Sequence, residues 1–125
     1  MAIKTEGRRD AQYLISEAAG NRSREQVTVT VPDAGYEAGT ILGKITATGK
    51  YVRHAAGATD GSEAEAGILY ANLTNGTGGP VDMPATITAR DTEVRASDLT
   101  YEVGADGAQE TASKAALAAL GIIAR

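Results

Sequence analysis

Residues 39–69 read GTILGKITATGKYVRHAAGATDGSEAEAGIL, and this stretch decides most of the fold. Two short β-prone segments, 40–47 and 50–54, flank the turn signal Thr48-Gly49 and are predicted to pair as a hairpin. Glycines punctuate the whole stretch. No reactive side chain stands here beside a base, so the pattern indicates a part built for contact and not for catalysis.

The rest of the chain contains further β signals. Residues 26–31 alternate valine with threonine, which is the period-two pattern of a half-buried or edge strand, and Pro32 ends the pattern. An edge strand can pair with a strand from another chain. Apolar or β-prone segments also occur at 67–73, after the turn signal Asp60-Gly61, at 85–90, which Pro84 starts, and at 93–96.

Near the C-terminus the pattern changes to that of a helix. Thr111 or Ser113 can cap the first turn, residues 115–120 favour helix, and Gly121 suits the left-handed position that ends a helix. Ile122 is expected to fold back on the last turn. A helix this short is marginal alone in water and must dock on the strands.

Composition indicates one domain with a lean core. A chain of 125 residues can bury roughly two thirds of its unfolded surface as a single domain. Its hydrophobic share of 42% includes 24 alanines, only 22 Val, Ile and Leu residues, and no Phe or Trp. Such a domain gains stability by burying more surface in an oligomer. The lack of cysteine excludes disulfides and thiolate sites.

Charge is unevenly distributed along the chain. Residues 1–25 hold five Lys or Arg against four acids, whereas residues 26–125 hold seven against twelve. The acidic body argues against nucleic acid as a partner, because phosphate contacts need a basic face. No apolar stretch has the length of a membrane span, and the N-terminus lacks the core of a secretory signal, so we expect synthesis in the cytoplasm and no membrane partner.

The first 25 residues differ in character from the rest. They are polar apart from one apolar cluster at Tyr13, Leu14 and Ile15, and such a segment cannot bury itself. Two interpretations stay open: a frayed terminus, or a flexible arm that orders on a partner with this cluster as its anchor. Residues 26–125 are expected to form a single compact domain.

Motifs for small-molecule chemistry fail on spacing. Gly39, Gly43 and Lys44 resemble a phosphate loop, which however needs four residues between its glycines and Ser or Thr after the lysine. The acidic group formed by Asp60, Glu63 and Glu65 lacks the spacing of a calcium loop and is predicted to be a solvated turn. His54 has no thiol to activate and no Gly-x-Ser-x-Gly elbow, so we expect a surface residue at a strand end. We therefore predict no catalytic, cofactor-binding or metal site.

Several short motifs occur in a recognisable order between about residues 13 and 123. They are Ser16-Glu17 with Gly20, Ser23-Arg24-Glu25, Ala38-Gly39-Thr40-Ile41-Leu42-Gly43, Thr59-Asp60-Gly61, Gly67-Ile68-Leu69, Glu93-Val94, and Ala119-Leu120-Gly121-Ile122. Their order and spacing resemble the head decoration proteins of tailed bacteriophages, the lambda-type family. The chain departs from the lambda protein by lacking Trp and Phe and by a more charged leader at residues 3–10.

The resemblance implies a mainly β fold of the clip type, with small helical parts, a flexible N-terminal arm and a short C-terminal helix. It also implies a homotrimer that lies on the outer surface of the capsid in the virion and acts as a cementing protein. Such trimers occupy local threefold sites of the expanded capsid and stabilise it against internal DNA pressure, without catalysing a reaction. Symmetry supports this role independently, because it multiplies modest contacts into avidity.

The resemblance further implies that the arm pairs with a strand of the major capsid protein. The matching segment is about residues 12–31. The residues predicted to make the contact are Tyr13, Leu14, Ile15, Ser23, Arg24, Val27 and Val29. No cofactor, nucleic acid, membrane or small-molecule substrate is expected.

Two other classes of function stay open on the sequence. A small β-rich module that binds carbohydrate or a fibre would need aromatic platforms, and the chain has no Trp. An enzyme on a related clip fold, such as a nucleotide hydrolase, would show a turnover that Asp60→Ala removes.

Overall fold

The computed structural model describes residues 6–125, and these form a mainly β fold with one α-helix, as predicted. In chain order the elements are β1 (Leu14–Glu17), β2 (Arg24–Val31), β3 (Ile41–Lys44), β4 (Tyr51–Arg53), β5 (Glu65–Leu69), β6 (Val81–Thr88), β7 (Thr92–Val94), a 3-10 helix (Ala96–Asp98), α1 (Gly107–Ala119) and β8 (Ile122–Ala124).

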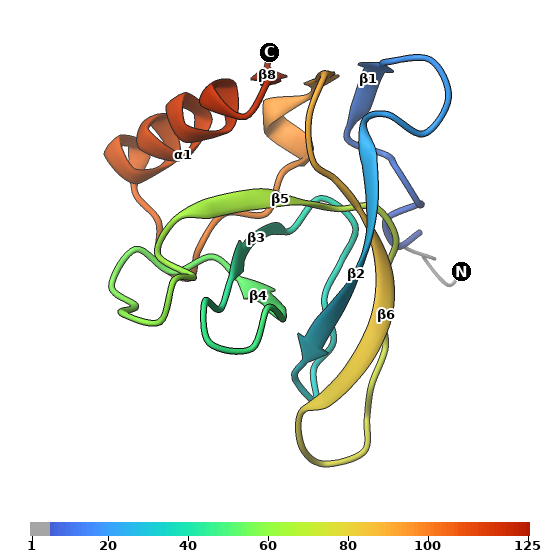
Figure 1. The fold of residues 1–125 in the computed structure, drawn as a ribbon, viewed down its shortest axis with the longest axis vertical. Coiled ribbons are helices and arrows are strands. Elements are labelled where there is room, and N and C mark those ends of the chain that lie inside the picture. Colours follow the sequence, from blue (N-terminus) through green and yellow to red (C-terminus); the bar gives the residue numbers. More distant parts are fainter. Residues whose placement is uncertain (1–5) are drawn as a thin grey trace, which may run out of the picture.

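Five of the strands close a small barrel in the order β2-β4-β3-β5-β6, with β6 returning to β2. β2 and β6 are the long strands and pair antiparallel over their full eight residues (Figure 1). β3 and β4 form the predicted hairpin, and Gly49 takes a φ of +72° in its turn. β2 and β4, in contrast, meet at a single parallel bridge between Val29 and Tyr51. The barrel is therefore weakly closed on this side.

A second sheet of three strands, in the order β1-β7-β8, lies at one end of the barrel beside α1 (Figure 1). β1 runs antiparallel to β7, and β8 runs parallel to it. β1 and β8, the first and last strands of residues 6–125, are thus the two edges of one small sheet.

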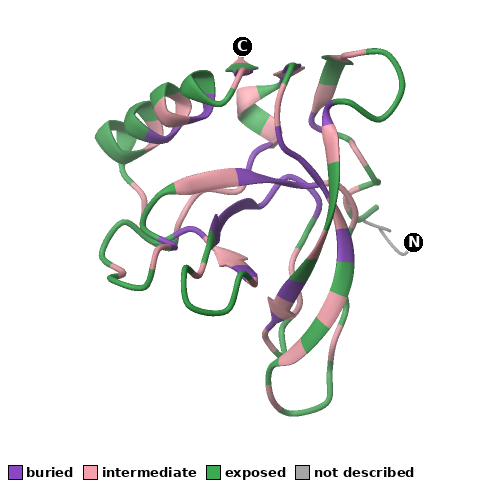
Figure 2. Ribbon diagram, in the orientation of Figure 1, coloured by how far each residue is buried: buried purple, intermediate pink, exposed green. Residues whose placement is uncertain are grey.

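Two apolar clusters hold the layers together. One fills the barrel and the other lies between the barrel, the small sheet and α1. Ile41 and Leu42 are neighbours in β3 yet belong to different clusters, as do Ile68 and Leu69 in β5, because side chains alternate across a strand. β3 and the end of β5 are therefore buried on both faces, and they appear purple in Figure 2.

One proline lies where the sequence did not predict it. Pro84 was expected to start a strand, but it lies within β6, opposite Thr28. On its other side β6 pairs with β5 only at Ile87 and Thr88. The missing N–H of Pro84 therefore falls where β6 has no neighbour, which is a position that tolerates proline in a sheet.

The C-terminal elements also differ from the expectation. α1 begins at Gly107 and is capped by Asp106, whose carboxylate accepts a 2.9 Å hydrogen bond from Gln109 N, so neither Thr111 nor Ser113 is the cap. The Gln109 side chain accepts a 2.9 Å hydrogen bond from Asp106 N in return, which completes a capping box. Ile122 starts β8 and does not simply fold back on the helix.

Candidate functional site

The residues predicted to contact a partner lie before and within β1, in the following turn and in β2. Tyr13 immediately precedes β1 and is fully buried in the second cluster. Its hydroxyl forms a 2.6 Å hydrogen bond with Thr88 Oγ1. Burial raises the pKa of the Tyr13 phenol well above its ordinary value, because the charged form would lose its hydration. In this structure Tyr13 is a core residue, whereas the sequence led us to expect it in an apolar anchor that orders on a partner.

Ser23 and Arg24 are both held by Glu17 of β1. The buried Ser23 hydroxyl donates a 2.7 Å hydrogen bond to Glu17 Oε2, and Arg24 donates to both carboxylate oxygens, through Nε at 3.1 Å and through its terminal nitrogen. The hydrogen bonds from Arg24 and then Ser23 lower the pKa of the Glu17 carboxyl. The Arg24 guanidinium also lies over the Tyr70 ring, 4.6 Å from its centroid. These contacts fix the turn from β1 to β2.

Three of the remaining predicted residues support the fold as well. Val29 is fully buried in the barrel. Val27 and Leu14 are half-buried, and each packs against one of the two clusters. Residues 13–25 thus lie against the rest of the chain in this structure, and residues 1–5 of the predicted arm fall outside the described part.

Ile15 differs from these residues because its side chain is 48% exposed on the edge strand of the small sheet. A β-bulge between Leu14 and Ser16 shifts the register there, and Ile15 and Ser16 are both exposed. Ser16 is paired in register with Glu93 of β7, which is paired with Ile123 of β8. Ser16 Oγ donates to Glu93 Oε1 at 3.0 Å, and Arg125 Nε donates to Glu93 Oε2 at 2.5 Å. We call Ile15, Ser16, Glu93, Ile123 and Arg125 the outer sheet face.

Sequence reasoning identified Ile15 but missed the C-terminal part of this face. A signal was present, since Ile122 is buried whereas Ile123 is 39% exposed, which is the alternation of a strand. Three residues after a helix are too few to reveal that period. Their pairing with β7 could be found only in the folded chain.

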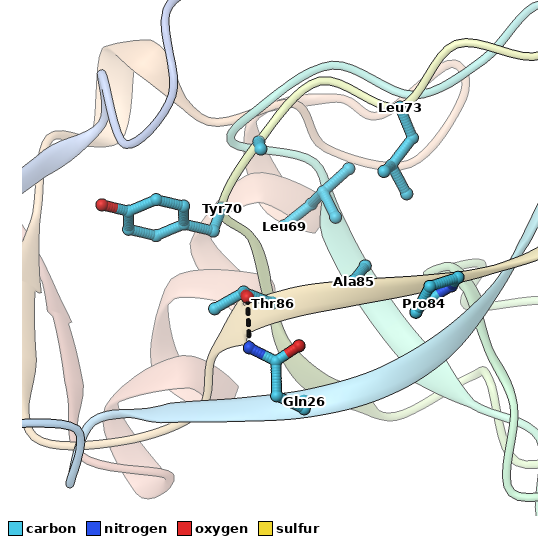
Figure 3. Close-up of a pocket in the computed structure, with 8 residues that line it drawn as sticks. Gln26, Leu69, Tyr70, Leu73, Pro84, Ala85 and Thr86 are labelled. Atoms are coloured by element: carbon cyan, nitrogen blue, oxygen red, sulfur yellow. Dashed lines mark hydrogen bonds between the residues drawn. The ribbon is translucent and has the colours of Figure 1, made fainter.

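A shallow hollow of about 320 Å³ lies between β2, β6 and the chain that follows β5 (Figure 3). Gln26 Nε2 donates a 2.6 Å hydrogen bond to Thr86 Oγ1, its partner on the neighbouring strand, and the Tyr70 ring lies to one side. The other described residues that line the hollow are all apolar: Leu69, Ala71, Leu73, Pro84 and Ala85. None of the lining residues carries a carboxylate or an imidazole, so the hollow offers no acid-base pair.

His54 is a core residue and not the surface residue expected from the sequence, since it is 3% exposed. Its Nε2 lies 3.0 Å from the Glu63 carbonyl oxygen and 3.2 Å from Glu65 Oε1. Ser113 of α1 donates to the same Glu65 oxygen at 2.7 Å. Because this hydroxyl bonds the carboxylate and not the imidazole, the three side chains form no nucleophile–base pair. They tie α1 to the barrel, which also removes Glu65 from the solvated turn that was expected.

Within residues 6–125 no three His, Cys, Asp or Glu side chains gather as metal ligands. In the same part of the chain, no helix has both the length and the apolar character needed to span a membrane. The geometry provides an exposed strand edge and a face of mixed apolar and charged side chains, which are features of a surface for contact.

A family model described as bacteriophage lambda head decoration protein D matches residues 3–122. This match spans the barrel and nearly all of the small sheet. The chain belongs to this decoration protein family. No curated protein matches it. Head decoration is a structural role on the phage capsid and not a class of enzyme activity, so this family member acts as part of the phage head.

Proposed function

We propose that this decoration protein binds as a homotrimer to local threefold sites on the outer surface of the expanded capsid. There it cements neighbouring capsomers against the internal pressure of packaged DNA. The observation that carries the proposal is the outer edge of β1, which no strand of residues 6–125 covers, together with its exposed Ile15. An edge strand leaves backbone N–H and C=O groups for a strand of another chain, here a segment of the major capsid protein.

A threefold arrangement suits contacts that are individually weak. β1 has four residues, and Ile15 is its exposed large apolar side chain. After one copy of a trimer docks, the next docking is intramolecular, so three modest contacts sum to stable attachment. The lean core, without Phe or Trp, also gains from surface buried between copies.

The proposed contact uses the N-terminal segment, residues 1–25, and continues toward β2. Ile15 touches the capsid protein directly, and the half-buried Leu14 and Val27 lie at the border of the contact. The buried and paired residues act indirectly by holding the segment in place: Tyr13, Ser23, Arg24 and Val29.

Ile15→Asp tests this contact, with Val103→Asp as its matched control. Val103 is 84% exposed in the loop before α1, outside the small sheet. We expect Ile15→Asp to weaken attachment to emptied, expanded heads of the phage by roughly tenfold or more, because a desolvated apolar contact is replaced by a charge. Val103→Asp should attach like the native chain. Co-sedimentation measures attachment, and imaging shows whether density sits at threefold positions.

Both variants should keep the native melting temperature, since both side chains are exposed. Equal attachment of Ile15→Asp and the native chain would exclude the β1 contact. Failure of the native chain to attach to heads at all would exclude the function itself. Sedimentation equilibrium of the free and released protein tests the trimer separately.

A further inference from the structure

The barrel has an open seam beside the first half of β2. β2 and β4 share only the bridge between Val29 and Tyr51, while all of β2 pairs with β6 on its other side. A groove of about 480 Å³ runs along the seam between residues 25–28 of β2 and the turn 48–51, with Lys44 at its border. We call it the seam groove.

Backbone groups of β2 face this groove. In an antiparallel pair, residues alternately direct their N–H and C=O toward the partner strand and away from it. The Thr86 carbonyl accepts a 3.1 Å hydrogen bond from Tyr70 N, so Thr86 faces away from β2. Its cross-strand partner Gln26 therefore faces away from β6, into the groove. Thr28 shares this orientation, and its partner Pro84 has no N–H to donate.

No strand of the described chain takes up these groups. The chain ahead of β4 turns away from β2, since the Lys50 carbonyl accepts a 2.8 Å hydrogen bond from Ile45 N on the β3 side. Within residues 6–125 the β2–β4 ladder does not extend beyond its one bridge. The Gln26 N–H and C=O and the Thr28 N–H are thus left for an additional strand.

The charges along the groove favour an acidic occupant. Arg90 neutralises Glu25 at 2.6 Å, and Asp82 neutralises Lys50 at 2.5 Å. Lys44 forms no salt bridge with any carboxylate of residues 6–125. One uncompensated positive charge therefore remains beside the exposed backbone of β2.

We propose that the seam groove binds an extended acidic segment of another polypeptide, which adds to β2 as a strand along residues 25–28 and places a carboxylate near Lys44. Four residues of β2 span roughly 13 Å, which suits a strand of four or five residues. Backbone hydrogen bonds supply the affinity, and Lys44 sets the preference for acidic side chains. The site lies on β2 and not on the outer edge of β1, although Val27 also lies at the border of the proposed capsid contact. Because the test uses the chain without capsids, its outcome does not depend on the proposed function.

The test titrates the ¹⁵N-labelled full chain with the capped peptide Glu-Val-Thr-Val-Thr-Glu and follows the amide resonances. We expect saturation with a dissociation constant of about 1 mM or tighter, and shifts centred on Gln26 and Thr28. Lys44→Gln should weaken binding roughly threefold, and it should abolish the preference for this peptide over the same peptide with Lys in place of Glu.

Two further measurements isolate the backbone contact. Gln26→Pro removes an N–H that forms no hydrogen bond with residues 6–125, so the variant should keep the native fold and lose the peptide. A peptide that is N-methylated at alternate residues should not bind the native chain. This measurement tests the backbone contact even if Gln26→Pro fails to fold. Absence of shifts at several millimolar peptide, shifts confined to other strands, or equal binding of the methylated peptide would each overturn the proposal.

Discussion

Tyr13 joins the N-terminal segment to the core through its ring and one buried hydroxyl. Tyr13 and Thr88 are both fully buried, and the hydrogen bond between them satisfies two polar groups that water cannot reach. A single buried pair thus links the start of β1 to the end of β6. The pair stabilises the fold only while both partners are present, because either group alone would be left unsatisfied.

Tyr13→Phe should lower the free energy of unfolding at pH 7 by about 1–2 kcal/mol, because the buried Thr88 hydroxyl loses its partner. The double variant Tyr13→Phe/Thr88→Val should lose less than the sum of the two single variants. Urea unfolding of the four proteins measures this coupling. Strict additivity would show that the hydrogen bond does not contribute to stability.

The same variant should change the response to alkaline pH. The pKa of Tyr13 is raised in the folded state by burial, so its contribution is complete below the pKa of an unfolded tyrosine, about 10, and is lost as the pH rises beyond it. Between about pH 9 and pH 11, a range that brackets the ordinary tyrosine pKa, the free energy of unfolding should therefore fall less for Tyr13→Phe than for the native chain. An equal loss in both proteins would contradict this.

At the scale of elements, β3 passes so close to the loop before β5 that residue 43 must be glycine. A Cβ added to Gly43 would lie 2.4 Å from the Ser62 carbonyl oxygen and 2.6 Å from its Cα. The requirement is steric, since the neighbouring atoms belong to backbone and cannot rotate away. This close approach brings the loop against β3. It lies at the bulge between Leu42 and Gly43, where the register shifts and Gly43 pairs with Glu65.

Gly43→Ala should destabilise the fold by about 2–3 kcal/mol, because β3 and the loop must separate. Gly57→Ala is the matched control, since a Cβ there would meet no atom within 4 Å. It should change stability by no more than about 0.5 kcal/mol. Thermal unfolding of both variants measures the difference, and similar melting temperatures would contradict the steric account.

At the scale of the whole molecule, both apolar clusters include side chains of β3 and β5. Unfolding around either cluster therefore exposes apolar side chains of the other cluster. Tyr13 at the start of β1 and Ile122 in β8 both complete the second cluster. The N-terminal segment beyond Gln12 is thus part of the folding unit. This bears directly on the expectation that residues 26–125 form a compact domain by themselves.

Deletion of residues 1–10 should leave a cooperative unfolding transition, with the melting temperature lowered by only a few degrees, because Tyr13 and β1 remain. Deletion of residues 1–25 should abolish that transition, because it opens the second cluster and leaves β7 without β1. Calorimetry of both proteins measures this. A cooperative, native-like transition for residues 26–125 would show that the segment is a dispensable arm.

The sequence alone determined the mainly β class, the hairpin around Thr48-Gly49, the strand at 26–31 and the C-terminal helix, and the predicted family was confirmed by the match over residues 3–122. These features depend on turn residues and on alternation over a few neighbours, which a local pattern contains. Of the predicted contact residues, the structure leaves Ile15 exposed on the edge strand β1, and the contact itself stays a prediction.

Only the tertiary structure decided which of the candidate residues face outward. His54 was expected at the surface and Tyr13 in an apolar anchor for a partner, yet both are buried. Tyr13 finds its hydroxyl partner 75 residues away, and β8 becomes a strand only because β7 lies beside it. Burial and pairing of this kind depend on groups that are distant along the chain, and the pattern around a residue contains no information about them.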